Sequence, residues 1–272
     1  MQDIITGCCQ FSIKPGDVGT NLATVESMLA DLAARKCQLV VLPEMWACSF
    51  PYRLLPSLAQ KTPGVLSRLQ ETAAQKGLVI VGSLPEEEDG HIYNSSYVID
   101  KTGEIAGKYR KVHLFSLYRE DHHFRRGNSL GVIETSLGKI GVIICYDLRF
   151  PELARQTALE GVGIICVSAQ WPRDRIEHWS LLLRARAVEN QLFVVACNGC
   201  GTEGKLKWGG HSAIISPWGE VVAQAGSDDQ TLLGVLHAGE MEDFRKMMPC
   251  FDDRVPEVYD PCSPAHAAQL KD

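Results

Sequence analysis

The sequence has no long apolar run and no excess of basic charge. Its apolar stretches are much shorter than the roughly 20 residues that a membrane-spanning helix needs. The formal net charge is -6 at pH 7, whereas nucleic-acid-binding proteins usually present a basic face. These two absences exclude a membrane protein and a nucleic-acid partner from our expectations, and a small-molecule substrate is the expected partner.

The amino terminus lacks the features of a secretory signal, because Asp3 stands where such a signal carries positive charge. The ten cysteines are scattered, and several lie within apolar runs such as 163–167. That distribution is typical of reduced, buried thiols and not of a disulfide framework. We therefore expect a cytoplasmic protein.

Repeats, low-complexity tracts and linkers are also missing, so we expect one domain over residues 1–272. Single domains of this length are common among α/β proteins. A chain of this size can bury roughly three quarters of its unfolded surface, so it needs no structural metal. Residues from about 249 onward carry four prolines and little periodicity, which predicts an irregular C-terminal tail.

The apolar runs that are present predict strands with helices between them. Runs rich in Val and Ile are typical of strands buried on both faces. They cover residues 38–42, 78–81, 139–144, 162–168 and 192–196. Residues 92–99 and 104–109 flank a turn and predict a hairpin.

Two helical segments are expected, one between the first two of these strands and one before them. Thr62 is expected to cap a helix that begins with Pro63 and ends at Gly77. Val25 and Leu32 bound a second apolar stripe with helical spacing. Alternating strands and helices, together with hairpins, predict an α/β fold with mixed sheets and outer helices.

Three reactive side chains follow strands of this expected sheet. Glu44 follows the first apolar run, Lys111 follows the hairpin, and Cys145 follows the run 139–144. Chemistry in α/β folds collects at the carboxyl ends of strands. Taken singly, a buried structural cysteine, a capping glutamate and a solvated lysine are the simpler interpretations. Together the three supply a nucleophile, a proton carrier and an oxyanion stabiliser for amide hydrolysis.

Three sequence blocks resemble the signatures of the nitrilase, or carbon-nitrogen hydrolase, superfamily. They are Leu42-Pro-Glu44, the segment 108–115 and the segment 144–152, and similarity extends over about residues 3–260. The resemblance implies a four-layer αββα sandwich that forms a homodimer. It also implies catalysis without a metal or other cofactor.

The resemblance further implies a role for each residue of the site. Glu44 would take the thiol proton of Cys145, and Lys111 with the backbone N–H of Tyr146 would hold the oxyanion. Glu120 resembles an additional glutamate that the superfamily places beside these groups.

Similarity is closest to the ω-amidase branch, whose members hydrolyse the terminal amide of 2-oxo acids such as 2-oxoglutaramate, 2-oxosuccinamate or a methylthio analogue. An arginine suits the carboxylate of such a substrate because its planar fork can bind both oxygens. Arg149 and Arg173 are the candidates, and a structural ion pair is the alternative for each. Trp171 is expected to shape the pocket.

Several alternatives remain open from the sequence. The chain could be an N-carbamoyl amino-acid amidohydrolase, an aliphatic amidase, a nitrilase, or an inactive scaffold of the same fold. Cys197 and Cys200 form one CxxC pair, which favours buried thiols over a zinc site or a thiol sensor. The basic loop 119–126 is a candidate lid and a candidate attractor of small anions.

Overall fold

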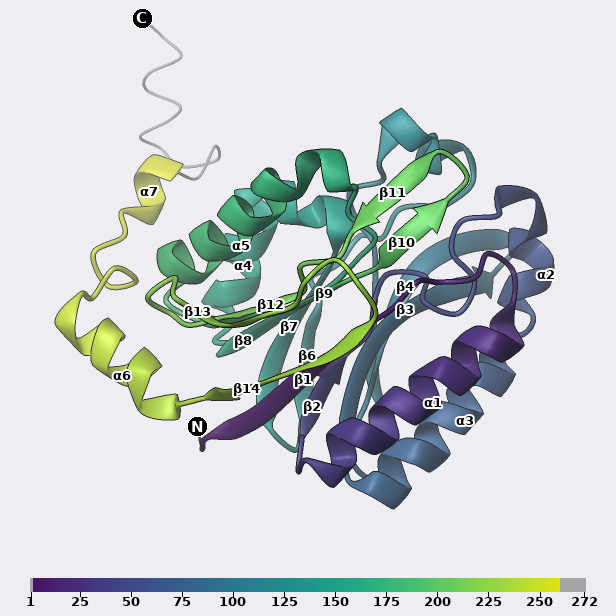
Figure 1. Ribbon diagram of the computed structural model, residues 1–272. Helices are drawn as coiled ribbons and strands as arrows, with labels where there is room; N and C mark the ends of the chain where they lie inside the picture. The colour runs from purple at the N-terminus through teal and green to yellow at the C-terminus, as the bar shows by residue number, and fades with distance from the viewer. Residues whose placement is uncertain (1, 260–272) are drawn as a thin grey trace, which may run out of the picture.

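The computed structural model describes residues 2–259, which form four layers (Figure 1). Two six-stranded sheets pack face to face, and a pair of helices covers the outer face of each sheet. This is the αββα sandwich with mixed sheets that the sequence predicts.

The first sheet has the strand order β14-β1-β2-β3-β4-β5. Strands β1, β2 and β3 run parallel, and the remaining neighbours pair antiparallel. Helices α1 (Val18–Ala34) and α3 (Thr62–Lys76) cover its outer face (Figure 1). The strands are β1 Ile4–Gln10, β2 Leu39–Val41, β3 Val79–Glu88, β4 His91–Ile99, β5 Ile105–Arg110 and β14 Gln230–Leu236.

The second sheet has the strand order β13-β12-β9-β8-β7-β6, and its central strands β7, β8 and β9 are parallel. Helices α4 (Pro151–Leu159) and α5 (Ile176–Asn190) cover its outer face (Figure 1). The strands are β6 Val132–Thr135, β7 Gly138–Ile144, β8 Ile164–Ala169, β9 Phe193–Asn198, β12 Ala213–Ile215 and β13 Val221–Gln224.

Helix α3 shows how the local sequence produces an outer helix. Val65 and Leu69 belong to its buried stripe, and Gly77 ends it in the left-handed conformation at φ 68°. The expectation that Thr62 caps this helix is wrong. Thr62 is already its first residue, and its hydroxyl donates a hydrogen bond to the carbonyl of Pro85 instead.

The space between the sheets is filled by small and branched side chains from both of them. Cys8 of β1 donates a hydrogen bond from Sγ to the carbonyl oxygen of Ala196 of β9 at 3.5 Å, and Cys197 donates to the carbonyl of Cys9 at 3.3 Å. The sheets also touch along their edges, where β5 meets β6 and β13 meets β14. The two sheets therefore share one apolar core.

The remaining elements are short. A hairpin of β10 (Cys200–Glu203) and β11 (Leu206–Gly209) stands apart from both sheets. The short helices are α2 Leu55–Ala59, α6 Ala238–Met247, α7 Pro256–Tyr259 and the 3-10 turns η1 Tyr52–Leu54, η2 Ser116–Tyr118, η3 Glu120–His122, η4 Cys145–Arg149 and η5 Arg173–Arg175.

The irregular tail expected from about 249 is described only in part. Residues 250–253 form turns before α7, and residues 260–272 lie outside the described part of the chain. Among the helices of residues 2–259, none combines the length and apolarity that crossing a membrane requires.

Candidate active site

The three reactive side chains meet between the two sheets. Glu44 follows β2 and Lys111 follows β5 of the first sheet, whereas Cys145 comes directly after β7 of the second. All three lie just beyond the carboxyl ends of their strands, where α/β folds gather functional groups. The site thus depends on both sheets at once.

Lys111 is the centre of a buried ionic cluster. Its Nζ lies 2.7 Å from Oε1 of Glu44 and 2.9 and 2.8 Å from the two carboxylate oxygens of Glu120. Burial alone would lower the pKa of Lys111, but the negative charges of Glu120 and Glu44 outweigh it and raise that pKa well above its usual value. Lys111 therefore carries a fixed positive charge at the base of the site.

Glu44 is held in one orientation by neutral donors. Asn94 Nδ2 donates to Oε1 at 2.8 Å, and the backbone N–H of Gln170 donates to Oε2 at 3.1 Å. The Gln170 side chain in turn donates to the Glu44 carbonyl at 3.0 Å. Asn94 and Gln170 were not predicted from the sequence, although a polar residue within an apolar hairpin strand and one beside Trp171 are detectable signals.

Cys145 occupies a strained position between β7 and η4. Its φ is 45°, in the left-handed region that non-glycine residues rarely adopt, and only 9% of its surface is exposed. Burial raises the pKa of its thiol well above the ordinary value, and the charge of Glu44 raises it further, whereas Lys111 opposes the shift. At neutral pH the thiol therefore keeps its proton, and the Glu44 side chain lines the same cavity.

Asp147 is a fully buried carboxylate two residues after Cys145. Its Oδ2 accepts hydrogen bonds from the backbone N–H of Ile144 at 3.0 Å and from the hydroxyl of Tyr109 at 2.7 Å. Its Oδ1 accepts from the backbone N–H and from ring Nδ1 of His113, at 2.9 and 2.8 Å. One side chain thus ties the turn that carries Cys145 to the segment that carries Lys111.

Glu120 begins the short helix η3 and points back to Lys111. Its Oε2 accepts a hydrogen bond from the backbone N–H of Phe115 at 3.1 Å. Burial raises its pKa, although the adjacent Lys111 charge acts in the opposite direction. The structure thus brings all four expected catalytic residues into one cluster.

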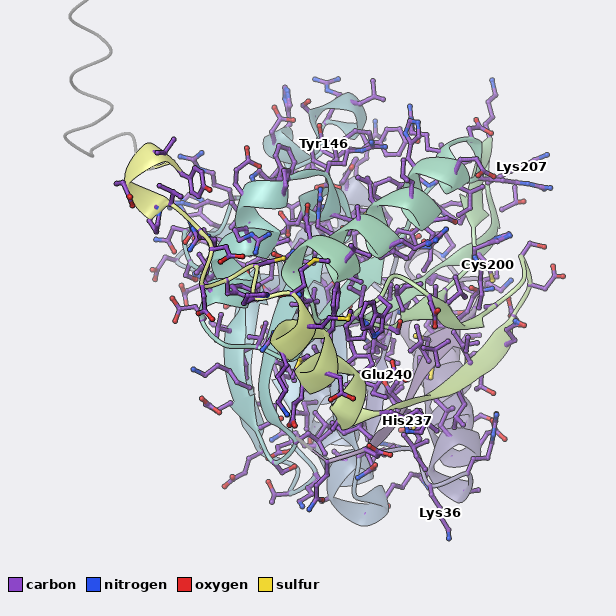
Figure 2. The ribbon with its side chains drawn as sticks, turned by 90° about the vertical axis from the view of Figure 1, so that its left-hand side faces the viewer. Lys36, Tyr146, Cys200, Lys207, His237 and Glu240 are labelled. Atoms are coloured by element: carbon purple, nitrogen blue, oxygen red, sulfur yellow. The ribbon has the colours of Figure 1, made fainter. Side chains whose placement is uncertain are left out.

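A cavity of about 270 Å³ opens onto Cys145, Glu44 and Glu120. Aromatic and apolar side chains make up most of its wall, and two of them are joined because the Tyr52 hydroxyl donates to the Tyr118 carbonyl at 2.8 Å. The other lining residues are Phe50, Phe115, Tyr146, Arg149, Gln170, Trp171, Pro172, Arg175, Glu203, Leu206 and Trp208. Figure 2 shows Tyr146 at the same end of the molecule as Lys207 of β11, far from Lys36.

The arginines expected to bind a carboxylate lie in different surroundings. Arg149 lines the cavity with its guanidinium 4.6 Å from the centre of the Trp171 ring, and no carboxylate of residues 2–259 forms an ion pair with it. Arg173 is exposed and does not line the cavity, whereas Arg175 on the same turn does. Arg175 was not predicted from the sequence.

Two further sequence features are accounted for by packing. The thiols of Cys197 and Cys200 are both buried, and Cys200 Sγ lies 3.1 Å from Oδ1 of Asp229. Within the basic loop 119–126, the His123 ring stacks on Tyr52 with ring centres 4.1 Å apart. This stacking anchors the loop against the wall of the cavity.

Comparison with known proteins places this arrangement in a family. The family model for "Carbon-nitrogen hydrolase" matches residues 5–246. The chain is 35% identical to a 2-oxoglutaramate amidase of Bacillus subtilis strain 168, over 93% of this chain and 98% of that protein. It is 33% identical to omega-amidase NIT2 of Xenopus tropicalis, over 92% and 94% of the two chains.

A solved structure with a similar fold is a mutant of the amidase from Nesterenkonia sp. AN1. It aligns with a TM-score of 0.81 at 26% identity, covering 90% of this chain and 98% of that chain. In that structure acrylamide has undergone Michael addition at the active-site cysteine. The whole-length match, the fold and the cluster of Cys145, Glu44 and Lys111 agree: this chain belongs to the carbon-nitrogen hydrolase family.

Proposed function

We propose that the protein is an amidase that hydrolyses the terminal carboxamide of a small 2-oxo acid, such as 2-oxoglutaramate, to the acid and ammonia. The observation that carries the proposal is that Cys145 and the Lys111-bound carboxylate of Glu44 line one cavity, whose wall also contains two arginines. The similarity to a 2-oxoglutaramate amidase supports the same substrate class.

In this mechanism Glu44 accepts the thiol proton while Sγ of Cys145 attacks the amide carbon. The charge that develops on the amide oxygen is stabilised by Lys111 Nζ and the backbone N–H of Tyr146, and one such donor commonly lowers the barrier by about 3 kcal/mol. Glu44 then gives its proton to the leaving nitrogen, and ammonia departs from a thioester. Water deprotonated by Glu44 hydrolyses that thioester and restores the thiol.

Glu120 positions Lys111 in this scheme. It contacts the ammonium with both carboxylate oxygens, and it is itself fixed by the backbone of Phe115. The carboxylate of the substrate is bound by Arg149, with Arg175 nearby on the cavity wall. An arginine without a protein carboxylate is available for a bidentate contact with a ligand.

Ammonia release by the wild type and by Cys145→Ser tests the proposal. The panel contains 2-oxoglutaramate, 2-oxosuccinamate, propionamide, N-carbamoyl-alanine and an aliphatic nitrile. We expect thiol-dependent turnover with the highest kcat/KM on the two oxo-acid amides. A higher kcat/KM on the carbamoyl compound, the neutral amide or the nitrile would overturn the assigned substrate and leave the thiol mechanism in place.

We also propose that the protein acts as a homodimer. Leu181 and Val188 of α5 are 67% and 43% exposed, and Trp218 is 39% exposed. Apolar side chains grouped on an outer helix are typical of a surface that another subunit covers. Light scattering should give twice the mass of one chain, and Leu181→Glu should shift it to that of a single chain; a single-chain mass for the wild type would contradict this proposal.

We also propose that the protein is located in the cytoplasm. The thiols of Cys8, Cys9, Cys166 and Cys197 are buried and unpaired, which suits a reducing compartment. Fractionation of cells that express the protein should recover it with cytoplasmic markers, and recovery with a secreted or membrane fraction would contradict the assignment.

A further inference from the structure

The cavity contains unpaired charges of both signs. Arg149 and Arg175 lie on its wall, and so does the carboxylate of Glu203. Within residues 2–259 none of these three groups forms a salt bridge. Leaving charged side chains without partners in a mostly aromatic cavity costs free energy. A ligand that carries one negative and one positive group would pair with them best.

We propose that Glu203 is a specificity-determining residue that binds an ammonium group of the substrate. The cavity would then accept terminal carboxamides of 2-amino acids, such as L-glutamine, as a second substrate class beside the 2-oxo acids. This inference rests on the proposed amidase chemistry of Cys145 and deepens it by naming the substrate group that Glu203 recognises.

The geometry of Glu203 leaves one oxygen available to a ligand. It is the last residue of β10, and its Oε2 accepts hydrogen bonds from the Ser49 hydroxyl at 2.6 Å and from Trp208 Nε1 at 3.4 Å. Its Oε1 has no hydrogen bond to residues of the described chain. Two donors therefore fix the carboxylate on one side, and the other oxygen remains free in the cavity.

Glu203 also lies close to the reacting groups. The Ser49 hydroxyl that contacts it lies 3.3 Å from Oε1 of Gln170, whose backbone N–H donates to Glu44. This chain of contacts joins the carboxylate to the immediate neighbour of Glu44. Because Glu203 and Cys145 also line the same cavity, one small ligand could contact both.

The arginine and the carboxylate share one wall of the cavity. Arg149 stacks over Trp171, and the next residue, Pro172, forms a β-bridge with Trp208. Trp208 donates its ring N–H to Glu203. In the proposed binding mode the ammonium and the carboxylate on one carbon of an amino-acid amide contact Glu203 and Arg149, while the amide end reaches the thiol.

The test compares Glu203→Gln with the wild type on 2-oxoglutaramate and L-glutamine. The side chain introduced by Glu203→Gln retains an oxygen for Ser49 and Trp208 but lacks the negative charge. Because a hydrogen bond to a charged group is commonly worth about 1.5–3 kcal/mol, the ratio of kcat/KM for 2-oxoglutaramate to that for L-glutamine should rise about 10- to 100-fold. A ratio that changes less than threefold would overturn the proposal.

Two controls separate a folding defect from a specificity change. Glu71→Gln alters an exposed glutamate of α3 and should keep both the ratio and the melting temperature of the wild type. L-glutamine binding to Cys145→Ala, measured by calorimetry with and without Glu203→Gln, gives the same comparison without turnover. We expect the added change to weaken that binding about 10- to 100-fold, and equal affinities would also overturn the proposal.

The outcomes for the two proposals are distinguishable. Wild-type turnover of 2-oxoglutaramate with none of L-glutamine overturns the Glu203 inference and keeps the proposed function. Turnover of L-glutamine that depends on Glu203, with none of 2-oxoglutaramate, does the reverse. Turnover of neither compound overturns both.

Discussion

Asp147 and His113 are joined by two hydrogen bonds to the same oxygen, one from the His113 backbone at 2.9 Å and one from its ring at 2.8 Å. His113 follows Lys111 by two residues, and Asp147 follows Cys145 by two. The pair therefore fixes the distance between the sulfur and the ammonium, although neither Asp147 nor His113 lines the cavity.

Replacement of Asp147 by Asn should impair both folding and catalysis. The amide nitrogen of Asn would face groups that now donate, so the free energy of unfolding should fall by about 1–3 kcal/mol. Because the sulfur and Lys111 would lose their common support, kcat should fall about tenfold or more, with a smaller change in KM. Tyr109→Phe, which removes one donor only, is the matched control, and a wild-type kcat in Asp147→Asn would refute this role.

Lys111→Met should be strongly destabilising because it leaves Glu44 and Glu120 buried without a cation. Breaking such a buried pair commonly costs about 3–5 kcal/mol. The double variant Lys111→Met/Glu120→Gln should regain part of this stability in urea unfolding. Both variants should have a strongly reduced kcat, since loss of one oxyanion donor commonly lowers kcat by about 100- to 1,000-fold. Equal stabilities of the single and double variants would show that the two carboxylates do not interact through Lys111.

The raised thiol pKa of Cys145 predicts that alkylation depends on Glu44. Iodoacetamide reacts with the thiolate, and in the proposed mechanism the wild type forms the thiolate at pH 7 by transferring the proton to Glu44. We expect a wild-type alkylation rate that is nearly constant from about pH 6 to 8. Glu44→Gln should react at least tenfold more slowly at pH 7, and its rate should rise about tenfold for each pH unit.

Peptide mapping by mass spectrometry would assign this alkylation to Cys145 and exclude the other thiols. Parallel pH profiles for the wild type and Glu44→Gln would mean that Glu44 is not the proton acceptor.

Arg149→Met should weaken binding of a substrate carboxylate selectively. We expect KM for 2-oxoglutaramate to rise about 10- to 100-fold, because a charge-assisted hydrogen bond is lost, and KM for propionamide to change much less. Arg173→Met tests the sequence-based expectation at an exposed position and should leave the KM for 2-oxoglutaramate within about twofold of the wild type. The opposite ranking of the two variants would return the carboxylate contact to Arg173.

Glu86 does not line the cavity and should contribute acid-sensitive stability. Burial alone would raise its pKa, but hydrogen bonds from Arg110, Lys108 and Ser95 lower it to about 2. Because the folded pKa lies below the unfolded value of 4.5, the contribution is complete above pH 4.5 and is lost as the pH falls toward about 2.

Glu86→Gln should accordingly reduce the free energy of unfolding by about 2 kcal/mol at pH 7, allowing for solvent around Lys108. The difference from the wild type should shrink on acidification, as measured by urea titrations at several pH values. A difference that is the same at pH 7 and pH 3 would contradict an electrostatic origin.

Local patterns predicted most of the central strands, because β7, β8 and β9 are buried on both faces and leave continuous Val and Ile runs. They also predicted the β4–β5 hairpin from its turn. The pairing of β1 with β14 was not predicted, since it joins Ile4 to Leu236. A contact over such a sequence distance depends on the packing of the whole sandwich.

The sequence was less informative about the cavity wall. Arg173 and Arg175 both follow Trp171-Pro172, and only the direction of the η5 turn decides that Arg175 lines the cavity. The contact of Gln170 with the Glu44 carboxylate uses its backbone N–H, which any residue except proline would supply. These roles depend on the direction in which the backbone points each group, and residue type alone does not specify that direction.

Cys145 and Glu44 lie on opposite sides of the boundary between the two sheets. A small slide of one sheet over the other would separate sulfur from carboxylate while every helix and strand kept its own hydrogen bonds. Turnover therefore requires a more exact arrangement than folding does. In mild denaturant this protein should lose its chemistry while its circular dichroism still looks native.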